Sequence, residues 1–96
     1  MANPEDEYTL LLTQLADILA VSEGNQFWEE KLRSLAKKKS LGIKGMNKLV
    51  REMYGGMGSL NDIYILLPKR AFGGKGNELF EKLRSDLYDL TERTEH

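Results

Sequence analysis

The spacing of apolar residues is the feature that most constrains the fold. In four stretches these residues recur every three or four positions, which places their side chains on one face of an α-helix. The spacing predicts helices over residues 4–22, 25–39, 43–54 and 77–91. Short connections favour antiparallel packing of successive helices. The expected fold class is therefore all-α, a compact four-helix domain.

The predicted helix ends have specific residues. Asn3 is expected to cap the first helix, with Pro4 in the first helical position. Gly24 is expected to follow its end in a left-handed conformation. Asn25 and Asn77 are the expected caps of the second and fourth helices.

The apolar residues of each stretch define its expected inner face. In the first helix these are Tyr8, Leu11, Leu12, Leu15, Ile18 and Leu19. In the second they are Phe27, Trp28, Leu32, Leu35 and Ala36. In the third they are Ile43, Met46, Leu49, Val50 and Met53, and in the fourth Leu79, Phe80, Leu83, Leu87 and Leu90.

A short apolar run, residues 63–67, lies between the third and fourth helices and ends at Pro68. Its β-branched and aromatic residues are typical of a strand, but the chain has no second run that could pair with it. We expect a short extended segment or a helical turn, buried against the helices. The composition leaves these two possibilities open.

Ninety-six residues are enough for one domain, so residues 1–96 are expected to form a single unit with a frayed tail at 92–96. The chain has no cysteine and no apolar run of the roughly 20 residues that cross a bilayer. Its acidic N-terminus lacks the basic start of a signal peptide. A cytoplasmic protein without membrane contact is expected.

Charge is segregated along the chain. Residues 1–30 have a net charge of −7, residues 31–75 of +9 and residues 76–96 of −3, which leaves −1 overall. Such segregation can mark a binding surface. It can also mean that an acidic helix packs beside a basic one, and this second interpretation is favoured.

Residues suited to catalysis are scarce, so an enzyme is not expected. The only histidine is His96, the last residue, where no scaffold orients it. Ser59 lacks the flanking glycines of a nucleophile elbow. Residues 73–76, Gly-Gly-Lys-Gly, lack the spacing and the preceding strand of a P-loop. No cofactor and no metal site are expected.

The most distinctive segment is residues 54–62, Tyr-Gly-Gly-Met-Gly-Ser-Leu-Asn-Asp. Glycine serves where the backbone needs a positive φ or a close approach. We expect at least one of Gly55, Gly56 and Gly58 to have a positive φ and to turn the chain out of the third helix.

This segment, with Trp28 before it and the leucine-rich stretch from Asn77 to Leu90 after it, resembles a family of small bacterial domains of unknown function. The resemblance covers most of the chain after residue 10. It implies a grouping and no activity.

The favoured function is a non-enzymatic protein-interaction or self-association module, with an unknown protein or a second copy as partner. The alternatives are a binder of nucleic acid or of a small anionic ligand, and an immunity or antitoxin-like protein with an acidic first helix. Nucleic acid is disfavoured by the isoelectric point of about 5.8. Lys44, Lys48 and Arg51 share one helix face by their spacing. The expected contact residues are Tyr54, Gly55, Gly56, Met57, Asn61, Asp62, Lys44, Lys48, Arg51, Lys69 and Arg70.

Overall fold

Helix α1, Pro4–Val21, begins where the sequence predicts. The side-chain oxygen of Asn3 accepts a hydrogen bond from the Asp6 backbone N–H at 2.9 Å, and Pro4 is the first helical residue. At the other end the Ser22 N–H donates to the carbonyls of Ile18 and Leu19. Gly24 follows with a φ of +80°, the left-handed conformation expected of it.

The computed structural model describes residues 3–54, 60, 63, 65–68 and 71–94. After α1 the described elements are α2 (Gln26–Ala36), the short 3-10 helix η1 (Lys39–Leu41), α3 (Gly42–Glu52), the 3-10 helix η3 (Ala71–Gly74) and α4 (Gly76–Arg93). The described residues contain no strand, and the predicted all-α fold with four helices is confirmed.

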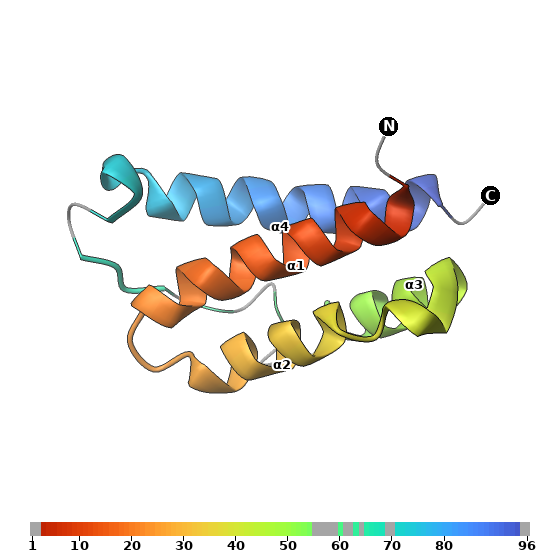
Figure 1. Ribbon diagram of the computed structural model, residues 1–96. Helices are drawn as coiled ribbons and strands as arrows, with labels where there is room; N and C mark the ends of the chain where they lie inside the picture. Colours follow the sequence, from red (N-terminus) through yellow and green to blue (C-terminus); the bar gives the residue numbers. More distant parts are fainter. Residues whose placement is uncertain (1–2, 55–59, 61–62, 64, 69–70, 95–96) are drawn as a thin grey trace.

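Helix α1 lies at the centre of the arrangement (Figure 1). It packs against α2, α3 and α4, and both α2 and α4 run antiparallel to it. Helix α3 also packs against α4, at the end of the bundle where α1 begins and α4 ends. This end brings together residues that are far apart in the sequence.

The core is formed by one cluster of buried apolar side chains, to which every α-helix contributes. Helix α1 supplies the largest share, with Tyr8, Leu12, Leu15, Ala16, Ile18 and Leu19. Its buried stripe is wide because α2 and α4 cover it from different sides.

The described residues of the apolar run, Ile63 and 65–67, have no regular secondary structure, nor does Pro68 after them. The run is tied to the end of α1: the Leu66 N–H donates to Ser22 Oγ at 3.3 Å, and the Leu66 carbonyl accepts from the Glu23 N–H at 3.4 Å. Ile65 is buried in the core, whereas Leu66 is exposed. The described part of the run is therefore irregular in structure and partly buried.

Two residues expected on inner faces are exposed instead. Phe27 is 69% exposed and Leu79 is 37% exposed. The stripe of α2 that faces the core is set by Leu32 and Leu35, with Trp28 half-buried four residues before Leu32. Phe27 precedes Trp28 by one position, which rotates its side chain by about 100° around the helix and out of this stripe.

Several predicted helix ends also differ. Helix α2 stops at Ala36, three residues early, and α4 continues to Arg93, two residues past its predicted end. The expected fraying of residues 92–96 stays a prediction. Helix α4 begins at Gly76, which places Asn77 inside the helix and not at its cap. Gly76 is buried against Leu67, and a Cβ atom at this position would lie 2.2 Å from Leu67 Cδ1. The close approach explains why the helix begins with glycine.

The glycine segment 55–59 lies outside the described residues, as do Asn61, Asp62, Tyr64, Lys69 and Arg70. The expected positive φ at Gly55, Gly56 or Gly58 therefore stays a prediction.

Replacing Leu15 or Leu83 with Ala should each lower the free energy of unfolding by about 2–5 kcal/mol, because both side chains are buried in the core. Leu10→Ala is the matched control: Leu10 is 58% exposed, and its loss should change stability by less than about 0.5 kcal/mol. Urea denaturation followed by circular dichroism measures all three. Equal losses for the three leucines would contradict the assignment of helix faces.

Candidate functional site

One groove stands out beside α3, and we call it the α3 groove. It has a volume of about 980 Å³. Six residues of α3 and one residue just past the end of α4 line it: Ile43, Lys44, Asn47, Lys48, Arg51, Glu52 and Thr94. Three cationic side chains and one anionic side chain give its lining a net charge of +2.

The α3 groove has this lining because of helix periodicity. Lys44, Lys48 and Arg51 follow one another at spacings of four and three, which stacks their side chains along one stripe of α3. The buried residues Met46 and Val50 anchor the neighbouring stripe in the core. Burial of one stripe therefore turns the cationic stripe toward the groove.

Lys44 and Lys48 are exposed, and neither forms an ion pair in the described part of the chain. The ion pairs that the structure describes join residues of α1, α2 and α4: Arg33 with Asp17, Arg33 with Glu29, Lys82 with Asp86, and Arg93 with Glu7. Acidic α1 does pack beside α3, as the favoured interpretation of the charge pattern expects, but among the described residues its carboxylates form no ion pair with these two lysines. Their charges are available to a partner.

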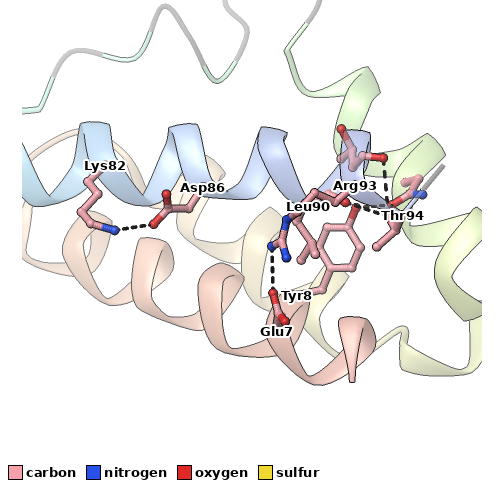
Figure 2. Close-up of polar contacts among 9 residues, drawn as sticks. Glu7, Tyr8, Lys82, Asp86, Leu90, Arg93 and Thr94 are labelled. Atoms are coloured by element: carbon pink, nitrogen blue, oxygen red, sulfur yellow. Dashed lines mark hydrogen bonds and ion pairs between the residues drawn. The ribbon is translucent and has the colours of Figure 1, made fainter. Parts of the chain in front are cut away.

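The floor of the groove is a buried polar contact between three helices. Tyr8 of α1 is fully buried, and its hydroxyl donates a hydrogen bond to Asn47 Oδ1 on α3. The Thr94 hydroxyl at the end of α4 lies 3.0 Å from the same oxygen and 2.7 Å from the Leu90 carbonyl (Figure 2). Asn47 thereby connects α3 to both α1 and α4.

The amide nitrogen of Asn47 has a different role from its oxygen. The residue is only 4% exposed, yet within the described residues its NH₂ group donates no hydrogen bond. No side-chain nitrogen or oxygen in that part of the chain is both fully buried and unpaired. The NH₂ group must therefore reach the surface, and the groove is the surface that Asn47 lines. It supplies a hydrogen-bond donor at the base of the cationic stripe.

Arg51 forms the wall of the groove next to α4. Its Nε lies 3.4 Å from the Thr91 hydroxyl oxygen, which in turn lies 2.6 Å from the Tyr88 carbonyl. Thr91 is fully buried. This contact holds the base of the guanidinium group against α4, which limits the side-chain entropy that a bound anion would have to remove.

Tyr54, which the sequence groups with these cations, lines a separate hollow with Glu81, Arg84, Ser85 and Tyr88. Its hydroxyl donates to the Arg84 carbonyl at 2.5 Å. Burial raises the pKa of Tyr54, and the nearby charge of Arg84 only partly opposes this. The phenol therefore stays neutral and acts as a structural donor.

Of the predicted contact residues, the structure brings Lys44, Lys48 and Arg51 together in one groove and places Tyr54 elsewhere. The others, Gly55, Gly56, Met57, Asn61, Asp62, Lys69 and Arg70, lie outside the described residues. Sequence reasoning missed Asn47 and Thr94. One signal was present: Asn47 is a polar residue on the apolar stripe between Ile43 and Val50.

Two features are absent from the residues that the structure describes. No three histidine, cysteine, aspartate or glutamate side chains among them converge so that they could hold a metal ion. None of the helices there combines the length and the apolar character that a bilayer crossing requires.

Residues 21–66 match the family of a domain of unknown function (DUF6966). This is slightly less than half of the chain, and it includes α2 and the whole of α3, but not Tyr8 or Thr94. The similarity agrees with the expected grouping among domains of unknown function and adds no activity. No curated protein and no solved structure was found to match the chain.

Tyr8→Phe should lower the free energy of unfolding by about 1–3 kcal/mol, because it removes a buried donor and leaves the Asn47 side-chain oxygen with one hydrogen bond fewer. Tyr88→Phe, at a position that is 38% exposed, is the control and should cost less than about 0.5 kcal/mol. Chemical denaturation monitored by tryptophan fluorescence gives both values. An unchanged stability in Tyr8→Phe would contradict the structural role of this contact.

Proposed function

We propose that the protein is a non-enzymatic interaction module that binds an acidic segment of a partner protein in the α3 groove. One observation carries the proposal: three cations of one helix line a single groove, and within the described residues Lys44 and Lys48 have no ion pair. The buried Asn47 adds a fixed donor at the base of the same stripe.

The chemistry of the lining favours carboxylate groups. Ammonium and guanidinium groups donate hydrogen bonds and accept none, and the Asn47 NH₂ group adds a neutral donor. A ligand with several acceptor oxygens satisfies this set, and charge-assisted bonds to such oxygens are stronger than neutral ones. The half-buried Ile43 offers an apolar contact beside the charges, which a peptide side chain can use.

A role without catalysis is supported by the residues themselves. The sequence has no cysteine and a single histidine, His96. Tyr54 is held in the neutral form by burial, which makes it a poor general base. Electrostatic steering of an acidic partner requires only the exposed cations.

Binding of nucleic acid is the second candidate, because the same three cations would contact phosphates. The acidic character of α1 and α4 opposes it: α1 has four acidic and no basic residues, and α4 has five acidic and three basic residues. A nucleic acid would be repelled by these flanking helices. Its binding would also weaken steeply as salt is raised.

The test uses a fluorescent oligo-glutamate peptide and a single-stranded oligonucleotide, measured by anisotropy at two salt concentrations. The wild-type protein should bind the peptide, and the double variant Lys44→Glu, Lys48→Glu should bind it at least about tenfold more weakly. Lys37→Glu with Lys75→Glu is the matched control, since it makes the same change in net charge at exposed sites outside the groove.

Peptide affinity that is the same in both double variants would contradict the groove as the binding surface. Tighter binding of the oligonucleotide than of the peptide, with a steep salt dependence, would favour the second candidate.

A further inference from the structure

A second groove, between α1 and α4, has the opposite charge. It has a volume of about 330 Å³ and is lined by Glu7, Leu10, Leu11, Asp86, Asp89 and Arg93. We call it the α1–α4 groove. Three anionic side chains and one cationic side chain give its lining a net charge of −2, the counterpart of the +2 of the α3 groove.

The anionic groups of the α1–α4 groove are only partly neutralised. Glu7 lies 3.0 Å from Arg93, and Asp86 lies 2.7 Å from Lys82 (Figure 2). Asp89 is exposed and forms no ion pair with any residue that the structure describes. Its charge is available in the same way as the charges of Lys44 and Lys48.

The α1–α4 groove also contains an exposed apolar side chain. Leu10 is 58% exposed beside the acidic residues, on a helix whose other face supplies the largest share of the core. Protein interfaces have an apolar centre within a polar rim, and Leu10 among its charged neighbours would supply such a centre. In the α3 groove the half-buried Ile43 occupies the equivalent place beside the cations.

The two grooves face away from each other. Arg51, at the edge of the α3 groove, contacts Thr91 of α4. Asp89 and Arg93 are each two residues from Thr91 and therefore lie about 160° around the helix from it. The grooves thus lie on opposite sides of α4, and a single chain cannot bring their charges together.

We propose that the α1–α4 groove of one copy binds the α3 groove of a second copy. The proposal rests on the proposed function, because it names a second copy of this chain as the acidic partner. Asp89 and its neighbours face Lys44 and Lys48, and Leu10 packs near Ile43. The contact joins different surfaces of the two copies, so each pair keeps one unused groove of each kind. Such a contact adds further copies or closes into a ring.

Sedimentation and light scattering test the contact over about a hundredfold range of protein concentration. The wild-type protein should grow in mean mass with concentration, and added salt should reverse the growth because exposed charges are screened. Two double variants each remove charge from one groove: Lys44→Gln with Lys48→Gln, and Asp86→Asn with Asp89→Asn. Each should associate about tenfold more weakly than the wild type.

Mixing these two double variants gives the most specific result. The first variant keeps its α1–α4 groove and the second keeps its α3 groove, so one intact contact remains possible between them. The mixture should form complexes of two chains, one of each variant, that do not grow further. The controls Lys37→Gln with Lys75→Gln, and Glu30→Gln with Glu78→Gln, make the same changes in charge at exposed sites and should associate like the wild type. Circular dichroism verifies that each variant is folded.

A wild-type protein that stays monomeric at every concentration would overturn the inference, and so would a mixture that forms no two-chain complex. Either failure is distinct from a failure of the proposed function. A monomeric protein that still binds the oligo-glutamate peptide through Lys44 and Lys48 would keep the α3 groove as a binding site and exclude the second copy as its partner.

Discussion

Burial of helix α1 is the constraint on which the rest of the structure depends. An amphipathic helix usually buries one narrow stripe, but α1 buries six residues over a wide arc and contacts α2, α3 and α4. Because α2 and α4 cover it from different sides, it supplies the common surface on which they pack. The charged residues of α1 are left outside the core, and one of them, Glu7, lines the α1–α4 groove.

The buried hydrogen bond between Tyr8 and Asn47 fixes the orientation of α3 within this apolar packing. Apolar contacts alone tolerate small rotations of α3, whereas a hydroxyl and an amide buried together require a defined geometry. Fixing Asn47 in the core also fixes the stripe of Lys44, Lys48 and Arg51 beside it. One polar contact inside the bundle therefore sets the orientation of the cations on its surface.

Much of the fold follows from local sequence pattern. The spacing of apolar residues locates all four α-helices, and the spacing of Lys44, Lys48 and Arg51 places them on one face. The orientation of an individual aromatic side chain does not follow, since Phe27 and Trp28 look equally suited to the core and only their angle around α2 separates them. The groove itself depends on Thr94, which is separated from Asn47 by 47 positions, so no local pattern could have paired them. The beginning of α4 at Gly76 also depends on a contact outside the helix, with Leu67 nine positions earlier.

The position of Thr94 has a practical consequence for anyone who handles the protein. Thr94 lines the α3 groove, and Glu7, in the first turn of α1, lines the α1–α4 groove. A purification tag or fluorescent protein fused directly after Thr94 would begin beside the α3 groove, and one fused directly before Asn3 would begin close to the α1–α4 groove. Either label would compete for the surface whose binding it is meant to report. A dye attached at the exposed outer face of α2, for example at Glu30, reports on the molecule while leaving both grooves clear.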